Sequence, residues 1–144
     1  MAQLHNTGEE WVLKEAFGSG SGATSVSCGL YNTSDALADS DNVDDITTEP
    51  SGAGYERQSA TLDADFSFQN NGGNWETIID DVVFDVDDSS VDVDGYFVTV
   101  EFESDEAGDS SPSENLLFTG ELDQEYDLNS VTQFTMQGSG ISID

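Results

Sequence analysis

The chain has 144 residues, of which 31 are acidic and 2 are basic, and its formal net charge at pH 7 is -29. Its length and its 35% of hydrophobic residues are sufficient for a single domain with one core. The charge excludes proteins that bind nucleic acid or an anionic membrane through a basic surface, because Lys and Arg side chains must supply that surface.

The amino-terminal segment is predicted to form a short amphipathic helix, from about Gly8 to Phe17. Thr7 and Glu10 have the spacing of a capping box, and His5 is expected in a frayed terminus before it. The helix has one broad apolar face, made by Trp11, Val12, Leu13, Ala16 and Phe17.

Alternating glycine and serine residues from Gly18 to Gly22 predict a flexible hinge after this helix. We therefore expect two parts, a helix with its hinge at residues 1–22 and a β domain at residues 23–144. Because the hinge lets the helix lie apart from the β domain, Trp11, Val12 and Phe17 are expected to contact another subunit.

The rest of the chain predicts an all-β domain, because short apolar–polar alternations recur between turn residues. The predicted strands are Ser25–Tyr31, Tyr55–Leu62, a segment containing Phe66 and Phe68, Trp75–Ile78, Val82–Val86, Tyr96–Glu103, Asn115–Leu122 and Thr132–Ile143, the last interrupted at Gly138–Gly140. Residues 32–49 predict a long surface loop with a helical turn around Asn42–Ile46. Asn70–Asn74 predicts a hairpin turn. This spacing of strands is typical of an antiparallel sandwich.

The segment Tyr96–Phe102 is predicted to be the central strand of this domain. Tyr96, Val98, Val100 and Phe102 form one fully apolar face, and the first half of the segment is apolar on both faces. A strand that is apolar on both faces is covered on both sides. Neighbouring strands should therefore pair with it or pack on it.

One acidic cluster has the ligand type of a hard-cation site. It consists of Asp85, Asp87, Asp88, Asp92 and Asp94, and it would take a divalent cation such as calcium. The spacing is not that of an EF-hand, because Ser90 stands at the glycine position and Tyr96 at the bidentate glutamate position. The alternative is a solvated strand face, since the acids alternate with valines.

Arg57, the only arginine, is predicted to form a bidentate pair with a carboxylate and so to fix the preceding loop. A ligand-binding role for Arg57 is the alternative.

The single cysteine, Cys28, excludes an internal disulfide and shares a strand face with Val26 and Leu30, so a buried thiol is expected. Nothing in the spacing of His5, Cys28 and the serines indicates a catalytic arrangement, and we expect no enzyme.

The even spread of acids from Glu9 to Asp144 indicates adaptation to high salt. Repulsion at this charge density is severe in dilute buffer, whereas a Debye length of ~3 Å at ~1 M salt screens most of it. The sequence contains no apolar run of membrane-spanning length and no pattern of a secretion signal, so neither is expected.

Six segments follow one another in an order that resembles a known family. They are the helix with its Gly/Ser run (Trp11–Gly22), the Val-Ser-Cys-Gly-Leu-Tyr-Asn strand (Val26–Asn32), the block Glu49–Gln58, the Asn-Gly-Gly-Asn-Trp turn (Asn71–Trp75), the Leu-Leu-Phe-Thr-Gly-Glu-Leu strand (Leu116–Leu122) and the closing strand Gly140–Asp144. This order is similar to that of small virion proteins of tailed viruses, in phages and haloarchaeal tailed viruses. The near absence of lysine and the acids between Val82 and Val93 depart from the family pattern.

The resemblance implies a jelly-roll-like antiparallel β-sandwich that functions by assembly. It implies a capsid decoration or turret subunit, a homo-oligomer that binds the major capsid protein or other virion subunits, in a virion assembled in the host cytoplasm. A tail or baseplate subunit of the same fold is the alternative. From a different class, a secreted halophilic carbohydrate-binding β-sandwich module would show a signal segment and exposed aromatic residues.

Overall fold

The structure is a computed structural model that describes residues 3–9, 12, 23–52, 54–61, 65–71, 74–86, 91–102, 114–137 and 140–143. Most of the described chain is β structure, and residues 6–9 and 12, near the amino terminus, are helical. The elements are β1 (Gln3–Leu4), β2 (Ala23–Tyr31), η1 (Thr33–Asp35), η2 (Val43–Asp45), β3 (Gln58–Ala60), β4 (Phe66–Asn71), β5 (Asn74–Ile79), β6 (Val82–Asp85), β7 (Asp92–Phe102), β8 (Glu114–Asp127), η3 (Leu128–Ser130), β9 (Gln133–Met136) and β10 (Gly140–Ile143).

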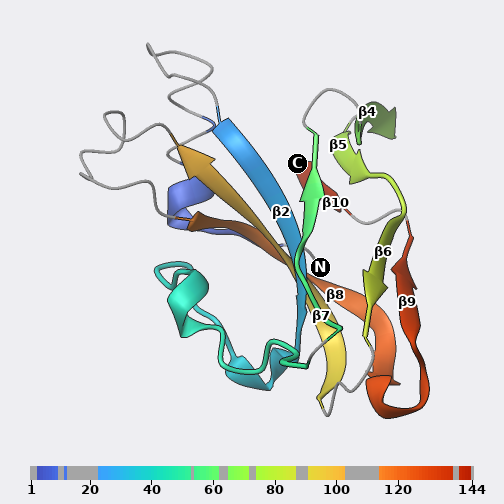
Figure 1. Cartoon of the computed structure of the whole chain (residues 1–144). Helices are drawn as coiled ribbons and strands as arrows, with labels where there is room; N and C mark the ends of the chain where they lie inside the picture. Colours follow the sequence, from blue (N-terminus) through green and yellow to red (C-terminus); the bar gives the residue numbers. More distant parts are fainter. Residues whose placement is uncertain are drawn as a thin grey trace.

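The strands form three antiparallel sheets (Figure 1). The largest has the order β1-β8-β7-β2-β3, the second has the order β10-β5-β4, and β6 pairs with β9 in the third. The predicted all-β antiparallel class is therefore confirmed. The prediction of a central strand is also confirmed, because β7 lies in the middle of the five-stranded sheet.

The main core lies on one face of the five-stranded sheet and is closed by the smaller sheets. Its largest fully buried side chains include Leu30 of β2, Ile79 of β5, Phe84 of β6 and Phe118 of β8. Met136 of β9 belongs to the same cluster. Cys28 is also fully buried here, and its burial raises the pKa of the thiol to about 12. The expectation of a buried thiol is confirmed.

The opposite face of the five-stranded sheet carries a smaller cluster, made by Tyr31, Phe97 and Leu116. Leu37, Val43 and Ile46 of the loop at residues 32–49 pack on it. The three apolar anchors of this acidic loop therefore cover a sheet face, which is why β7 is apolar on both sides. The predicted helical turn is present as η2, capped by Asn42.

Carboxylates serve as internal hydrogen-bond acceptors in this loop. Asp35 accepts from the backbone N–H and the hydroxyl of both Thr47 and Thr48, at 2.6–3.0 Å. Partial burial acts to raise the pKa of Asp35, but these four hydrogen bonds outweigh it and lower the pKa below its ordinary value. Asp94 of β7 holds the other end of the loop, accepting from the N–H and the hydroxyl of Thr33 at 2.6 Å each.

Three glycines of the large sheet lie opposite aromatic residues on neighbouring strands. Gly29 pairs with Phe97, Gly95 with Tyr31 and Gly120 with Tyr96. In each pair the aromatic ring covers the glycine, so that an added Cβ would lie 2.2–2.5 Å from the ring. Such rings cover the exposed backbone of a strand glycine and fix the register of the pair.

Two differences from the predicted bounds affect the sites described below. β3 covers only Gln58–Ala60, and Arg57 precedes it instead of lying inside it. β8 continues to Asp127, because a wide bulge interrupts its pairing with β7 and the ladder then resumes. Val93 faces Tyr126 and Gly95 faces Glu121, so residues 122–125 have no partner on β7.

In the part of the chain that the structure describes, no helix is long and apolar enough to cross a membrane.

Candidate functional site

The guanidinium of Arg57 connects three parts of the fold. Its Nε and Nη2 donate to the two carboxylate oxygens of Glu49, at 2.8 and 2.7 Å, and its Nη1 donates to Glu114 of β8. Glu114 also accepts from the Thr99 hydroxyl on β7, at 2.6 Å. The structure thus contains the bidentate pair expected for Arg57, and this pair joins the end of the long loop to the central strands.

The same guanidinium lies over an aromatic ring. Its Cζ is 5.0 Å from the centroid of Phe97, which is itself fully buried. The Tyr55 hydroxyl donates to Glu49 at 3.1 Å and accepts from the Leu30 N–H at 2.9 Å. Because every polar group of this cluster is paired inside the chain, we assign Arg57 a structural role.

Replacing Arg57 by Met should lower the free energy of unfolding by about 2 kcal/mol, between the values for exposed and buried pairs, because the Arg57 side chain is 28% exposed. The substitution leaves Glu49 and Glu114 close together without their shared cation. Urea unfolding in ~2 M sodium chloride measures the loss, and Lys14→Met removes the same charge elsewhere as the control. An unchanged midpoint for Arg57→Met would contradict the structural role.

The acidic cluster does not converge on one point in the described residues. Asp87 and Asp88 lie outside them, Asp85 and Asp92 are exposed, and the Asp94 carboxylate is bonded to Thr33. No group of three or more His, Cys, Asp or Glu side chains able to hold a metal occurs in the part described. Because Asp87 lies outside the described residues, the cation site of Asp85, Asp87, Asp92 and Asp94 stays a prediction. In the structure, Asp94 accepts hydrogen bonds from Thr33.

The prediction of a frayed amino terminus is wrong for His5 and the residues next to it. His5 is fully buried, its N–H donates to the Leu117 carbonyl at 3.1 Å, and its Nε2 lies 3.3 Å from the Thr119 hydroxyl. Gly8 is also buried against β8, where a Cβ would lie 2.3 Å from the Leu117 carbonyl oxygen. The terminus is ordered because β1 pairs with β8 and places His5 at the edge of the core.

The predicted capping box is also wrong. The helix includes Asn6, so Thr7 lies inside its first turn, and the Thr7 hydroxyl donates to the Leu116 carbonyl on β8. Of the three residues predicted to contact another subunit, Val12 is half-buried, and Trp11 and Phe17 lie outside the described residues. Their subunit contact, and the division of the chain at residue 22, stay predictions.

Burial of His5 predicts a loss of stability in mild acid. Burial lowers the pKa of His5 below 6.5, although the carboxylates of Asp39 and Asp41 oppose this. Below pH ~6.5, His5 binds a proton in the unfolded chain more readily than in the folded chain. The free energy of unfolding therefore falls as the pH is lowered, by up to ~1.4 kcal/mol per pH unit.

The measurement is urea unfolding between pH ~7.5 and ~5.5, where His5 is the only side chain with an ordinary pKa in the window. His5→Asn should remove the pH dependence. A wild-type midpoint that stays constant across this window would contradict the buried, neutral state of His5.

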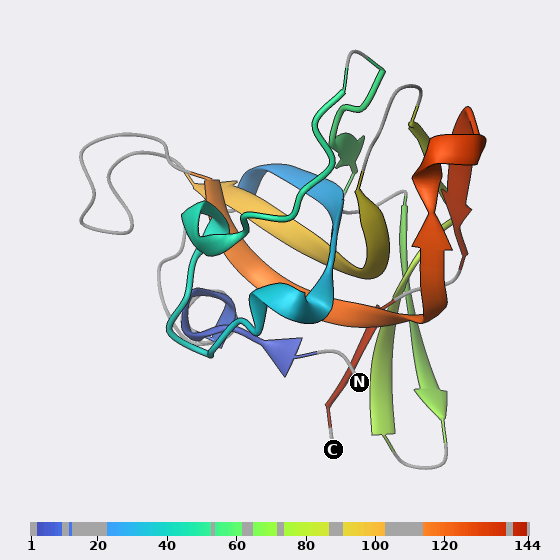
Figure 2. The same cartoon turned by 90° about the horizontal axis from the view of Figure 1, so that it is seen from below.

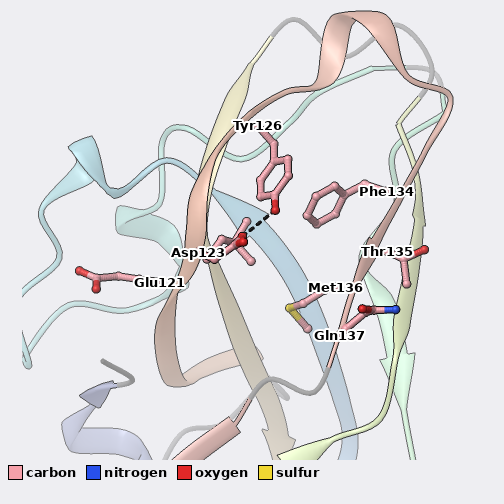
Figure 3. Close-up of a pocket in the computed structure, with 8 residues that line it drawn as sticks. Glu121, Asp123, Tyr126, Phe134, Thr135, Met136 and Gln137 are labelled. Atoms are coloured by element: carbon pink, nitrogen blue, oxygen red, sulfur yellow. Dashed lines mark hydrogen bonds between the residues drawn. The ribbon is translucent and has the colours of Figure 1, made fainter.

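A hollow of about 350 Å³ lies between the end of β8 and β9 (Figure 3). The rings of Tyr126 and Phe134 meet edge to face in it, with centroids 5.1 Å apart. The Tyr126 hydroxyl donates to Asp123 Oδ1 at 2.6 Å, and this bond raises the pKa of the phenol. Met136 and Gln137 line the other side, on and after β9.

This hollow follows from the wide bulge in β8. Leu122 and Asp123 leave the β7 ladder, and the turn at η3 brings β9 back across from them. Two aromatic side chains beside a carboxylate and an amide suit a cyclic ligand that has apolar faces and hydroxyl groups at its edge. No local pattern predicts this site, because a bulge depends on the register of two strands.

The hairpin of β4 and β5 carries the most exposed large apolar side chain among the described residues. Phe66 packs against the main core opposite Ile79, whereas Phe68, opposite Thr77, is 69% exposed. Residues two apart share a strand face, so the core-facing side of this hairpin continues past the core into solvent. Figure 2 shows the hairpin, in light green, projecting from the rest of the molecule.

Comparison with known proteins gives no match: no family model matches the sequence, and no curated protein and no solved structure shows significant similarity to it.

Proposed function

We propose that this chain is a virion structural protein of a halophilic, haloarchaeal tailed virus, and that its domain is a jelly-roll-like β-sandwich. The first choice is a capsid decoration or turret subunit that binds the major capsid protein or other virion subunits. A tail or baseplate subunit of the same virion is the alternative. The protein functions by binding and assembly, in a particle that forms in the host cytoplasm.

The observation that carries this proposal is the apolar face of the β4–β5 hairpin, which ends in Phe68 outside the protein's own core. Covering the exposed Phe68 ring with a partner removes its apolar surface from water, which is favourable, so this residue supports a surface that another protein covers. In a chain of net charge -29, such a surface supports association with a partner in high salt.

The internal polar clusters support the same role. Asp35, Glu49, Asp94 and Glu114 are all engaged in hydrogen bonds or ion pairs inside the chain. They fix the long loop on the sheet and so give the domain a defined outer shape. A subunit that must fit its neighbours in a particle needs such a shape.

Immunogold electron microscopy tests the proposal. Antibodies raised against the recombinant protein are applied to tailed particles purified from the organism that carries the gene, in molar salt throughout. Gold on the heads supports a decoration or turret subunit, and gold on the tails supports the alternative. Particles without gold, while the same antibodies recognise the protein in cell extract, would contradict a virion role.

The hollow between β8 and β9 favours a second candidate, the carbohydrate-binding module. Tyr126 and Phe134 offer apolar ring surface, and Asp123 and Gln137 offer polar groups beside it. Titration of the protein with soluble oligosaccharides in ~2 M sodium chloride, followed by NMR, tests this function. Shifts confined to the lining residues and lost in Tyr126→Ala would support it, and a spectrum unchanged by all sugars would exclude it.

A further inference from the structure

We propose that β4 pairs with β4 of a second copy of this chain, in an antiparallel arrangement about a two-fold axis at Phe68. This inference deepens the proposed function, because it assigns the surface through which identical subunits meet. Its test uses the purified protein alone and so does not depend on the virus.

Among the strands that the structure describes, β4 has a neighbour on one side only. In the sheet of order β10-β5-β4, the strand β4 is terminal, and β5 occupies only one of its sides. The strand has six residues, Phe66–Asn71, and pairs with β5 without a register shift. A regular, unbulged edge of this length is a template for another strand.

Proteins usually protect such an edge with charged side chains, and this one has none. The segment Phe66–Asn71 contains no acidic residue in a chain where 31 of 144 residues are acidic. In the three strands of its sheet, Glu76 is the only acid. The usual protection against edge pairing is therefore missing at β4.

Charge identifies the occupant. A basic partner would be drawn to the acidic surfaces and would gain nothing at an uncharged strand, whereas two copies of net charge -29 repel least where neither carries acids. An uncharged edge that carries an exposed aromatic ring is complementary to a second edge of the same kind. The same edge on a second copy meets this requirement.

Phe68 fixes the register. A two-fold axis at this residue places the two Phe68 side chains directly opposite each other on one face, where aromatic pairs are favourable. A shift by one residue would place the two rings on opposite faces of the joined sheet and leave both in water. The axis at Phe68 is therefore the arrangement that buries the exposed apolar area.

Other exposed edges do not offer this combination. β9 is also free of acids, but its outward residues Gln133 and Thr135 are polar, and Phe134 packs against Tyr126. Val131, 40% exposed, follows η3 and does not lie in a strand. Among the described edges, β4 alone joins an acid-free strand to a largely exposed aromatic side chain.

Sedimentation velocity in ~2 M sodium chloride tests the pairing. We expect a reversible monomer–dimer equilibrium, with a dissociation constant raised at least ~10-fold by Phe68→Asp. Val131→Asp adds the same charge at another exposed apolar residue and should leave the constant unchanged. A wild-type protein that stays monomeric at ~1 mM, or equal effects of the two variants, would overturn the proposal.

Cysteine cross-linking tests the register. In this arrangement Ser67 lies directly opposite Gln69 of the second copy, with Cα atoms ~4.5 Å apart, so a mixture of Ser67→Cys and Gln69→Cys should form a covalent dimer on mild oxidation while Phe68 is kept. Ser67→Cys alone should not form it, and the buried Cys28 gives the background. Equal cross-linking of the mixture and of Ser67→Cys alone would overturn the axis at Phe68. If the purified protein forms no dimer but the antibodies still label virus particles, the pairing proposal fails and the virion role stands.

Discussion

The melting temperature of this protein should rise steeply with sodium chloride, from ~0.1 M to ~2 M, and most of the rise should be complete once the Debye length is a few ångströms. The acids repel one another most in the folded chain, where they lie closest. The free energy of unfolding is expected to rise by several kcal/mol, and each kcal/mol raises the melting temperature of a domain of this size by ~3 °C.

The structure locates part of this repulsion at the two ends of the β7–β8 ladder. Asp92 lies directly opposite Asp127, and Glu101 directly opposite Glu114. Like charges in facing positions of an antiparallel pair destabilise it. Both Asp92 and Asp127 are exposed, so dissolved salt screens this pair.

Thermal melts with parallel light scattering across the salt series measure the effect. Asp92→Asn should stabilise the protein by ~0.5 kcal/mol at low salt and by nothing measurable at ~2 M. Asp81→Asn removes one exposed charge elsewhere and gives the general contribution of net charge. A melt that is flat across the series would show that the acidic surface is no adaptation to brine.

Gly29→Ala should lower the free energy of unfolding by about 3 kcal/mol, an unusually large effect for one added methyl group. The new Cβ would lie 2.2 Å from Cζ of Phe97. The Phe97 ring has no room to move, because Tyr31 packs against it edge to face and the Arg57 guanidinium lies over it. The added methyl group therefore displaces a ring that holds the sheet, the loop and the ion pair together.

A double-mutant cycle with Phe97→Leu tests this explanation. The smaller side chain makes room for the new methyl group, so the loss in the double mutant should be well below the sum of the two single losses. Urea unfolding in ~2 M sodium chloride provides the three free energies. Additive losses would mean that Gly29 is required for its backbone and not for the ring above it.

The sequence by itself was sufficient for the class of fold and for its central strand. Alternation of apolar residues in Tyr96–Phe102 is a local property of a strand, and apolar residues on both faces require cover on both sides. The pairing of Arg57 was predictable for a similar reason. One guanidinium among so many carboxylates finds a partner in any compact arrangement.

Only the tertiary structure decided which residues meet across the fold. Burial of His5 depends on β1 pairing with β8, and the hollow at Tyr126 and Phe134 depends on the wide bulge at residues 122–125. The exposure of Phe68 depends on where the core ends under the β4–β5 hairpin. Phe66 and Phe68 have the same side chain and the same strand face, so local pattern cannot separate them. Their difference arises because burial is set by the elements that pack on a face, and these come from distant parts of the chain.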